Sequence, residues 1–269
     1  MTSRAKIKGV VLAGGLGRRL GPLTEITNKH LLPIWDRPMI FYPLRALLEA
    51  GIDDVLVVTG GQNPGDFLRL LGDGREFGFR HLSFTYQKGQ GGIAAALACA
   101  EEFAAGGPVC VVLGDNILEA SIRPQVETFQ TQGDGSRVLL KKVENPRRFG
   151  VARFAGKKLS EVIEKPKNPP SPYAVIGVYF YDSGVFDIIR GLAPSRRGEL
   201  EIADVTNSYL KDGTLTYGIQ PGWWTDAGTV ESLHNASSLA ARTWFSPSSK
   251  QIFWPPFDTW VERRLRNSQ

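Results

Sequence analysis

The stretch Val11-Leu-Ala-Gly-Gly-Leu-Gly-Arg-Arg-Leu20 decides how the first part of this chain folds. An apolar run over residues 7–13 breaks into a glycine-rich turn that carries two arginines, and Lys29 follows Arg19 further along. Glycines let the backbone approach a bulky anion closely, and their N–H groups form an inward-pointing nest. Arginine and lysine supply the compensating charge. The pattern indicates a strand, a turn and a site for a polyphosphate.

Two common glycine loops do not fit this stretch. The dinucleotide-binding fingerprint needs a third glycine where this chain has Leu20, and no Walker sequence ending in Gly-Lys-Ser/Thr is present. The spacing therefore disfavours a dehydrogenase. A tight strand-to-helix turn with solvated arginines is the remaining alternative to a phosphate site. Lys29, in an otherwise apolar stretch before Pro33, argues against that alternative.

Composition restricts the class of protein further. A chain of 269 residues with 42% hydrophobic and 22% charged residues can bury a large core and is not expected to be disordered. The formal net charge of +5 suits an anionic ligand, but the basic residues are scattered, so we expect no nucleic-acid partner. Cys99 and Cys110 lack metal-binding spacing, which favours a reducing cytoplasm. We expect no signal peptide and no membrane span.

The first half of the chain has the pattern of an α/β fold. We expect strands at 7–13, 54–59, 82–86 and 108–113, with helices at 39–50, 66–71 and 93–103 between them. Continuous apolar strands separated by helices predict a Rossmann-like, mixed but mainly parallel central sheet with helices on both faces. The carboxyl ends of such strands share one edge of the sheet, so the glycine turn and Asp115 should both lie there.

The pattern changes after about residue 135. Strands are expected at 138–143, 151–154, 159–164 and 174–181, and helices at 184–190, 200–210 and 230–242. These strands predict a smaller antiparallel lobe. The tail over residues 244–269 concentrates tryptophan and phenylalanine in a proline-broken stretch. Because so much aromatic surface is unfavourable in water, we expect the tail to pack on the body or on a partner subunit.

At this point the motifs resemble those of the sugar-1-phosphate nucleotidyltransferases, and of the glucose-1-phosphate thymidylyltransferases in particular. That family opens with Leu-Ala-Gly-Gly-x-Gly-Thr-Arg-Leu and has a lysine before Leu-Leu-Pro, as Lys29 is here. Six further matches follow in order, so that the resemblance covers about residues 7–243: Asp36-Arg-Pro-Met-Ile40, Leu113-Gly-Asp-Asn116, Arg148-Phe-Gly-Val151, Glu164-Lys-Pro166, Gly198-Glu-Leu-Glu-Ile202 and Trp224-Thr-Asp-Ala-Gly-Thr229.

The resemblance implies a function and a domain plan. It implies Mg²⁺-dependent transfer of a nucleotidyl group from dTTP to glucose 1-phosphate, which gives dTDP-glucose and pyrophosphate without a covalent intermediate. Residues 1–243 would form one nucleotidyltransferase domain, with the nucleotide bound by about 1–135 and the sugar by about 136–243. The family also implies a cytoplasmic homo-oligomer, either a dimer or a tetramer.

Site residues are carried over from the matched motifs. The resemblance implies that Arg19 and Lys29 stabilise developing charge, and that Asp115 and Asp226 hold Mg²⁺, which prefers one or two carboxylates plus phosphate oxygens and water. It assigns nucleotide contacts to Gly14, Gly15, Gly17, Gln87 and Gly92, and sugar-phosphate contacts to Gly150, Glu164, Lys165 and Val175. From the residues alone, each aspartate could instead cap a helix. Neighbouring Glu164 and Lys165 could also be an exposed pair on opposite faces of a strand.

Three positions depart from the family pattern: Arg18 replaces a usual threonine, Ala95 a polar residue and Phe149 a frequent tyrosine. These departures keep open UTP or CTP as the nucleotide, or another phosphate ester as acceptor. A single methyl group separates dTTP from UTP, and such a group contributes only ~1–3 kcal/mol to discrimination. A non-catalytic, nucleotide-sugar-binding regulatory subunit is the second alternative. Such a protein should have lost a residue of the charged set, whereas this chain keeps Arg19, Lys29, Asp115 and Asp226.

Overall fold

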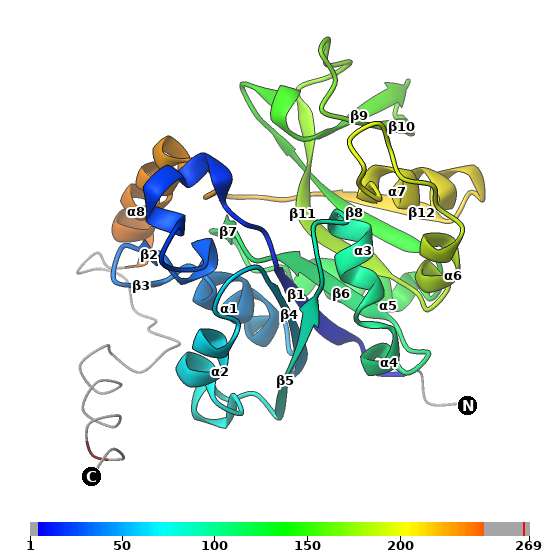
Figure 1. Ribbon diagram of the computed structural model, residues 1–269. Coiled ribbons are helices and arrows are strands. Elements are labelled where there is room, and N and C mark those ends of the chain that lie inside the picture. The colour runs from blue at the N-terminus through cyan, green and yellow to red at the C-terminus, as the bar shows by residue number, and fades with distance from the viewer. Residues whose placement is uncertain (1–4, 245–265, 267–269) are drawn as a thin grey trace.

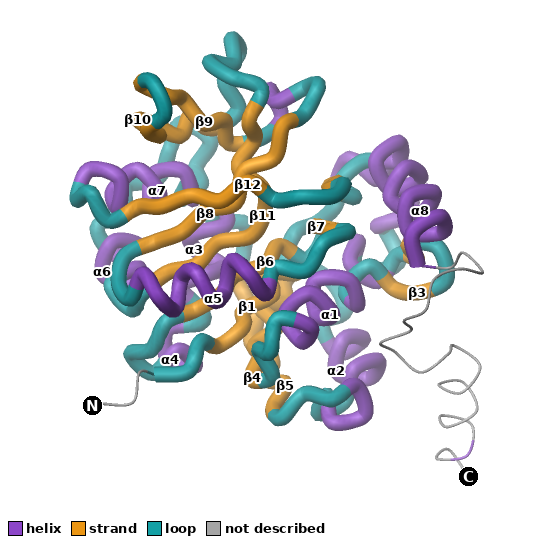
Figure 2. The backbone as a smooth tube through the Cα atoms, turned by 180° about the vertical axis from the view of Figure 1, so that it is seen from behind, coloured by secondary structure: helices purple, strands orange, loops and turns teal. Residues whose placement is uncertain are grey.

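The first four predicted strands form the parallel centre of a nine-stranded sheet (Figures 1 and 2). The computed structural model describes residues 5–244 and residue 266. β1 (Lys8–Ala13) lies between β4 (Asp54–Gly60) and β6 (Val109–Leu113), and β5 (His81–Gln87) completes the edge beyond β4. All three pairings are parallel. The predicted α/β class is confirmed, and each of these strands ends within one residue of its expected bounds.

The antiparallel strands of the second half extend the same sheet. β11 (Tyr173–Tyr181) pairs antiparallel with β6 and also with β8 (Ser136–Lys142) and β9 (Gly150–Ala155). β10 (Lys158–Glu164) follows β9 as a hairpin, and β12 (Leu215–Ile219) pairs parallel with β8. The β9–β10 hairpin rises above the rest of the sheet at the top of Figure 1. β12 is the one strand of this sheet that the sequence pattern did not predict.

Helices cover both faces of the sheet. One face carries α1 (Phe41–Glu49), α2 (Gly65–Leu71) and α5 (Arg123–Gln132); the other carries α3 (Ile93–Ala98), α4 (Glu101–Ala104), α6 (Val185–Arg190) and α7 (Ile202–Lys211). The sequence pattern did not predict α5, because this helix buries only Val126 and Phe129 and so has few apolar positions at helical spacing. The helix expected over 93–103 is two short helices, since the backbone leaves helical geometry at Ala100, with φ −97° and ψ 1°. Among the described residues, four 3₁₀ helices span Arg18–Thr24, Lys29–Leu31, Arg75–Phe77 and Pro146–Arg148.

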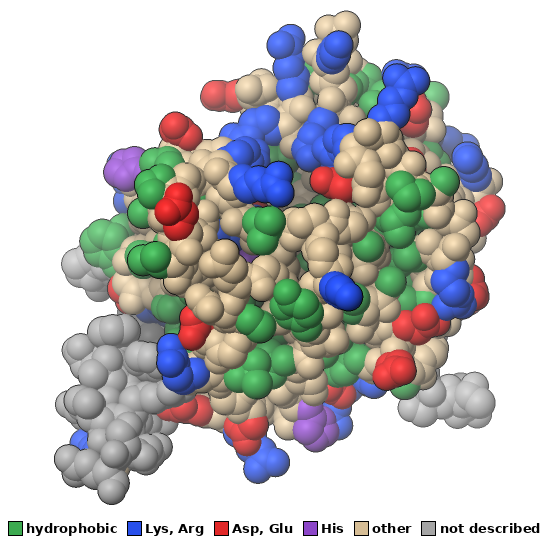
Figure 3. Space-filling view, viewed as in Figure 1, with side chains coloured by type: hydrophobic (Ala, Val, Ile, Leu, Met, Phe, Trp, Pro, Cys, Tyr) green, Lys and Arg blue, Asp and Glu red, His purple; other side chains and the backbone are tan. Residues whose placement is uncertain are grey.

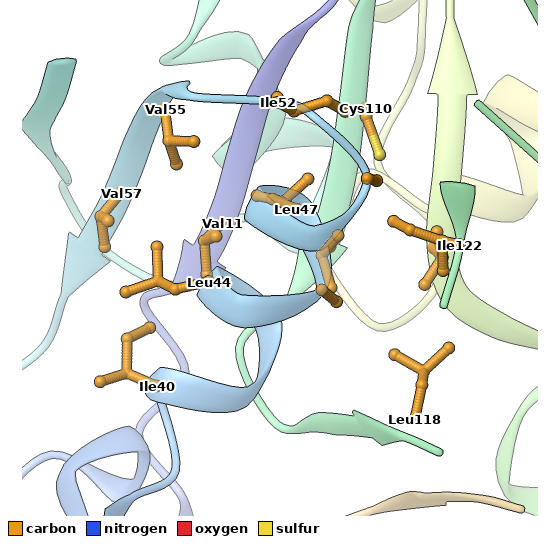
Figure 4. Packing of buried hydrophobic residues seen from close by; sticks show 14 of the residues in the cluster. Val11, Ile40, Leu44, Leu47, Ile52, Val55, Val57, Cys110, Leu118 and Ile122 are labelled. Atoms are coloured by element: carbon orange, nitrogen blue, oxygen red, sulfur yellow. The ribbon is translucent and has the colours of Figure 1, made fainter. Parts of the chain in front are cut away.

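The side chains of β1 alternate between the two faces of the sheet and are apolar on both, which explains why helices must pack on both faces. Val11 points into a cluster with Leu44 and Leu47 of α1, as Figure 4 shows, whereas Val10 joins Leu97 of α3 on the opposite face. A fully apolar strand of this kind is stable only when helices bury it on both sides. The polar side chains that could bind a ligand are therefore carried by the loops at the carboxyl edge of the sheet.

A smaller unit lies beside that edge. The short strands β7 (Asn116–Leu118) and β13 (Trp224–Asp226) form an antiparallel pair, and β2 (Pro33–Ile34) pairs with β3 (Arg37–Pro38). α8 (Val230–Trp244) packs here, with its Trp244 ring 5.5 Å from that of Tyr42 and 5.2 Å from that of Trp223. The rest of the aromatic tail, apart from residue 266, lies outside the described residues. Within residues 5–244, no helix is both long and apolar enough to cross a bilayer.

Candidate active site at the carboxyl edge of the sheet

Nearly all the predicted site residues line two adjoining cavities at the carboxyl edge of the sheet. The first, here called the β9–β11 cavity, is lined by Arg19, Asp115, Gly150, Glu164, Lys165, Val175 and Asp226, among others. The second, the glycine-loop cavity, is lined by Gly14, Gly15, Lys29, Gln87 and Gly92, and again by Asp115, Glu164 and Lys165. Because three charged residues line both, the two cavities form one continuous cleft. Figure 3 shows Lys and Arg side chains gathered along one margin of the hollow.

Asp115 and Asp226 meet because β7 pairs with β13. In this register Asp226 lies opposite Asn116, and the N–H of Ala227 donates to the carbonyl oxygen of Asp115 at 2.8 Å. A Cβ atom added at Gly228 would lie 3.1 Å from Asp226 Oδ2 and 3.6 Å from Asp115 Oδ2. The two carboxylates therefore face one small space, although more than a hundred residues separate them in the chain.

Neither aspartate caps a helix. Asp115 accepts hydrogen bonds from Lys29 Nζ at 2.5 Å and from Asn116 Nδ2 at 2.9 Å. Asp226 accepts from the Arg148 guanidinium at 3.1 Å. The start of α8 is capped instead by Thr229, whose Oγ1 accepts from the N–H of Ser232 at 3.2 Å. The capping alternative is thus wrong for both carboxylates.

Buried polar groups hold Asp115 and Lys29 in place. The Asn116 side chain, which is buried, accepts from the N–H of Gly177 at 3.0 Å and from Trp224 Nε1 at 2.7 Å, so it joins β7, β11 and β13. On the other side His30, fully enclosed, shares a 2.7 Å hydrogen bond with Asn28 Oδ1. Asn28 in turn donates to carbonyl oxygens of β1 and β4 at 3.3 and 3.2 Å. Lys29 therefore lies between His30 and Asn28, and hydrogen bonds anchor Asn28 to β1 and β4.

The glycines of the first loop leave room for Lys29. A Cβ atom at Gly15 would lie 3.1 Å from Lys29 Cε, and one at Gly17 would lie 2.8 Å from Lys29 Cβ. Gly17 also has φ +65°, which side chains rarely adopt. Gly17 lines neither cavity, unlike the other predicted residues. The structure therefore places Gly17 as a determinant of loop shape rather than as part of the cavity wall.

Gln87 and Gly92 close the far wall of the glycine-loop cavity. Gln87 is buried at the end of β5, and its Nε2 donates to the carbonyl oxygen of Gly92 at 3.3 Å. Gly92 has φ +91°, and a Cβ there would lie 2.7 Å from the carbonyl oxygen of Leu200. A side chain at this position would thus push α3 away from the segment that leads into α7.

Strand register brings together the residues of the β9–β11 cavity. Gly150 pairs with Glu164 across β9 and β10, and with Val175 across β9 and β11. A Cβ at Gly150 would lie 3.4 Å from Glu164 Oε2, so this glycine leaves the carboxylate accessible. Aromatic rings form part of the wall, with Phe149 packed edge-on to Trp224 at 5.1 Å.

Glu164 and Lys165 both line the cleft, which disfavours the alternative of an exposed pair on opposite faces of a strand. β10 ends at Glu164, and Lys165 has φ +42°, a left-handed conformation uncommon for a residue with a side chain. Its N–H donates to the carbonyl oxygen of Phe149 at 3.0 Å. The turn directs both side chains toward the cleft, where Lys165 Nζ lies 3.3 Å from Glu164 Oε1. Backbone strain of this kind is typical of functional sites.

The sequence pattern missed two arginines in the cleft. Arg148 binds Asp226, and Arg197 binds Glu199 and Glu201 at 2.6 and 2.9 Å while lining the glycine-loop cavity. Arg148 belongs to a motif used for the resemblance, and Arg197 directly precedes another. The position of each arginine in or beside one of those motifs could have indicated a role in the site. Which carboxylate each arginine binds depends on the tertiary structure.

The acidic groups of the cleft differ in how readily they ionise. Burial is the largest single influence on Asp115 and opposes its ionisation, but the Lys29 charge and the hydrogen bonds from Lys29 and Asn116 together hold the pKa of this carboxyl well below its usual range. Burial and the nearby Asp115 charge raise the pKa of Asp226, and burial raises the pKa of Glu164. Two carboxylates that face one space, one of which raises the pKa of the other, are a suitable donor set for a divalent cation. Within the described residues no cluster of three or more His, Cys, Asp or Glu side chains forms a metal site, so phosphate or water would complete the coordination.

Comparisons with known proteins agree with this geometry. Residues 8–243 match the Nucleotidyl transferase family. A curated glucose-1-phosphate thymidylyltransferase of Neisseria meningitidis is 44% identical over 237 residues, which cover 87% of this chain and 82% of that protein. A Bacillus anthracis crystal structure named for the same activity, with bound sucrose, has a TM-score of 0.84 and 50% identity and covers 87% of this chain and 95% of its own.

A more distant structural neighbour has a different nucleotide in its name. It is an apo UDP-glucose pyrophosphorylase with a TM-score of 0.78 and 25% identity, covering 88% of this chain and 99% of its own. Taken with the family match over residues 8–243, these relatives settle the classification. The chain belongs to the nucleotidyl transferase family, among relatives named glucose-1-phosphate thymidylyltransferase.

Proposed function

We propose that this nucleotidyltransferase transfers a thymidylyl group from dTTP to glucose 1-phosphate and so forms dTDP-glucose and pyrophosphate. The observation that carries the proposal is the meeting of Asp115 and Asp226 in one cleft with Lys29 and Arg19. The 44% identity to a glucose-1-phosphate thymidylyltransferase over 87% of the chain supports the choice of substrates.

In this reaction a phosphate oxygen of the sugar phosphate forms a bond to the α-phosphorus of the triphosphate. The bond from that phosphorus to the bridging oxygen breaks, and pyrophosphate leaves with the electron pair. Such a reaction requires alignment and charge compensation rather than a covalent intermediate. The nucleotide would occupy the glycine-loop cavity, against Gly14, Gly15, Gln87 and Gly92. The sugar phosphate would occupy the β9–β11 cavity.

The charged residues have distinct proposed roles. Lys165, held toward the cleft by its left-handed turn, would bind the phosphate of the sugar phosphate, and Glu164 would accept hydrogen bonds from sugar hydroxyls. Lys29 would stabilise charge near the α-phosphate, and Arg19, which reaches the space beside Gly228, would stabilise the leaving group. Gly150 and Val175 would contact the sugar through the backbone, as their place in the cavity wall allows.

Asp115 and Asp226 would hold Mg²⁺. A divalent ion bound there would neutralise phosphate charge and so favour attack on the phosphorus. Their shared space beside Gly228 supports the assignment, as does the raised pKa of Asp226 next to the Asp115 charge.

UTP is the second candidate for the nucleotide. It is favoured by the structural likeness to UDP-glucose pyrophosphorylases and by the small energy that one methyl group contributes to discrimination. The acceptor could likewise differ, because Phe149 packs on Trp224 in the sugar-side wall and offers no hydroxyl.

The test is a matrix of dTTP, UTP and CTP against several sugar 1-phosphates, scored by pyrophosphate release with and without Mg²⁺. We expect the largest kcat/KM for dTTP with glucose 1-phosphate, and no turnover without the metal. Faster turnover of UTP than of dTTP would reject the thymidylyl assignment alone. No release with any pair would reject the enzyme in favour of a nucleotide-sugar-binding protein.

We add two proposals, on the cellular location of the enzyme and on its oligomeric state. We place the enzyme in the cytoplasm, where its free cysteines Cys99 and Cys110 would stay reduced. We also propose a homo-oligomer, which size measurements in solution would test.

A further inference from the structure

Asp226, one of the two proposed metal ligands, is paired with a cation in the structure. Its Oδ2 accepts a hydrogen bond from Arg148 Nη2 at 3.1 Å, and among the described residues no other group donates to this carboxylate. The partner of Asp115 is a second cation, because Lys29 Nζ lies 2.5 Å from its Oδ2. Both carboxylate oxygens that face the shared space beside Gly228 are therefore bound to basic side chains.

A third cation borders the same space. A Cβ atom at Gly228 would lie 3.0 Å from Arg19 Nη2, and 3.1 and 3.6 Å from the nearest oxygens of the two aspartates. Burial and the Asp115 charge raise the pKa of Asp226, and the three cations oppose this rise, Arg148 most strongly. Two carboxylates thus face three cations, so their immediate surroundings carry an excess of positive charge before any substrate binds.

This charge balance disfavours a divalent cation that arrives alone. Such an ion would meet the charges of Arg148 and Arg19 at short range, and it would have to displace Arg148 from Asp226. Repulsion of this kind is weakly screened, because the two carboxylate side chains are each only 15% exposed. A phosphate group removes both obstacles, since its oxygens are new partners for a guanidinium and its charge offsets that of the metal.

Arg148 is placed so that it can exchange partners in this way. It ends a three-residue 3₁₀ helix ahead of β9, and its side chain is 36% exposed. It also lines the β9–β11 cavity, where the sugar phosphate is proposed to bind. An ion pair with one partly exposed member contributes little to stability, so little free energy is required to break it.

We infer that Arg148 is a counter-ion that Asp226 must release before a divalent cation binds, so that metal and phosphate bind to the cleft cooperatively. This cooperativity is reciprocal: the factor by which phosphate tightens metal binding equals the factor by which the metal tightens phosphate binding. The inference rests on the proposed function and deepens it, because it concerns the metal site of the same reaction. Arg148 acts through Asp226 and is therefore a positioning residue.

The test measures the binding of Mn²⁺, used in place of Mg²⁺, from the electron paramagnetic resonance signal of the unbound ion. Titrations are made without ligand and with saturating dTDP-glucose, whose own affinity for Mn²⁺ is measured without protein. Arg148→Gln removes the charge and Arg148→Lys keeps it. The matched control is Arg153→Gln, since Arg153 is an exposed arginine of β9 that pairs with Glu161 and lines neither cavity.

For Arg148→Gln without ligand we expect the Kd of Mn²⁺ to fall about fivefold, the effect of releasing one partly exposed ion pair. Arg148→Lys and Arg153→Gln should stay within about twofold of the wild type. In the wild type, dTDP-glucose should lower the Kd of Mn²⁺ by about tenfold or more, and in Arg148→Gln by a smaller factor. Adding Asp226→Asn to Arg148→Gln should abolish the gain in affinity, because the released carboxylate is then absent.

An equal Kd of Mn²⁺ in Arg148→Gln and the wild type would overturn the inference. An equal fall in Arg153→Gln would overturn it too, because the effect would then reflect net charge alone. Absence of turnover with every substrate pair would reject the proposed function, whereas the titrations without ligand would still decide the role of Arg148. If no form of the protein bound Mn²⁺, with or without dTDP-glucose, the inference and the metal assignment would both be rejected.

Discussion

Asp115 is a largely buried carboxylate that depends on its neighbours for stabilisation. Its side chain is only 15% exposed and contacts Lys29 and Asn116, and it would be costly to bury as an anion without them. The Lys29 charge and the hydrogen bonds from Lys29 and Asn116 lower the pKa of this carboxyl despite its burial, which favours the charged form that a cation requires.

Asp115→Asn should reduce kcat by at least about 100-fold, because the amide keeps the shape but loses the charge that a divalent ion requires. Pyrophosphate release at saturating substrate measures the effect. The far-UV circular dichroism spectrum should stay unchanged, and Asp73→Asn, at an exposed carboxylate that lines none of the cavities described above, serves as the control. Full activity of Asp115→Asn would remove this residue from the proposed metal site.

His30 makes the stability of the fold depend on pH. Burial is the largest cause that lowers its pKa, followed by the Lys29 charge, and together they bring it from 6.5 to about 3. Below pH 6.5 the unfolded chain therefore binds a proton on this ring, while the folded chain does not. The free energy of unfolding must then rise with pH between about 3 and 6.5.

His30→Gln should remove this contribution, which amounts to about 1.4 kcal/mol per pH unit below pH 6. Denaturant unfolding at pH 7.5, 6 and 5 measures it as the difference between wild type and variant. The variant itself can be less stable at every pH, so the readout is the slope and not the absolute value. Parallel pH dependences for the two proteins would show that His30 is protonated in the folded state.

At the scale of elements, the pairing of β7 with β13 creates the site. Each strand is only three residues long, and neither is stable alone. The Asn116 amide and the packing of α8 hold the pair against β11 and α1. The geometry of both aspartates is thus a property of this junction.

Gly228→Ala tests whether the space between the carboxylates is needed. The added methyl group would lie 3.0 Å from Arg19 Nη2 and 3.1 Å from Asp226 Oδ2, so one of them must move. We expect kcat/KM to fall by about tenfold, because the groups that must yield by a few tenths of an ångström are a proposed metal ligand and a proposed phosphate-binding arginine. Gly65→Ala, where nothing lies within 4 Å of the new methyl group, should keep wild-type activity. If both variants were equally active, the shared space would have no catalytic importance.

For the whole molecule, a net charge of +5 and the basic margin of the cleft favour the capture of two anionic substrates. Raising the salt concentration from about 50 to about 300 mM should increase both KM values severalfold, because screening weakens attraction beyond about one Debye length. The kcat should change much less, since buried pairs are screened weakly. Initial-rate kinetics at constant Mg²⁺ measure both parameters, and salt-independent KM values would contradict electrostatic capture.

Apolar patterning and glycine spacing in the sequence determined the parallel half of the sheet, the glycine turn and its cations. These features follow from local physics, since a buried strand needs a continuous apolar run and a tight turn needs glycine. Local pattern failed for α5 and β12, which bury few side chains, and for Lys165, where the backbone leaves the strand conformation. The motifs singled out Asp115 and Asp226, but not how the two side chains meet.

Only the tertiary structure decided that junction. Strand pairing acts between segments far apart in the chain. It sets Asp226 opposite Asn116, and the fold brings Arg148 within hydrogen-bond distance of Asp226. Contacts of this kind depend on the register of whole elements, and register is selected by the packing of the complete core rather than by any short stretch.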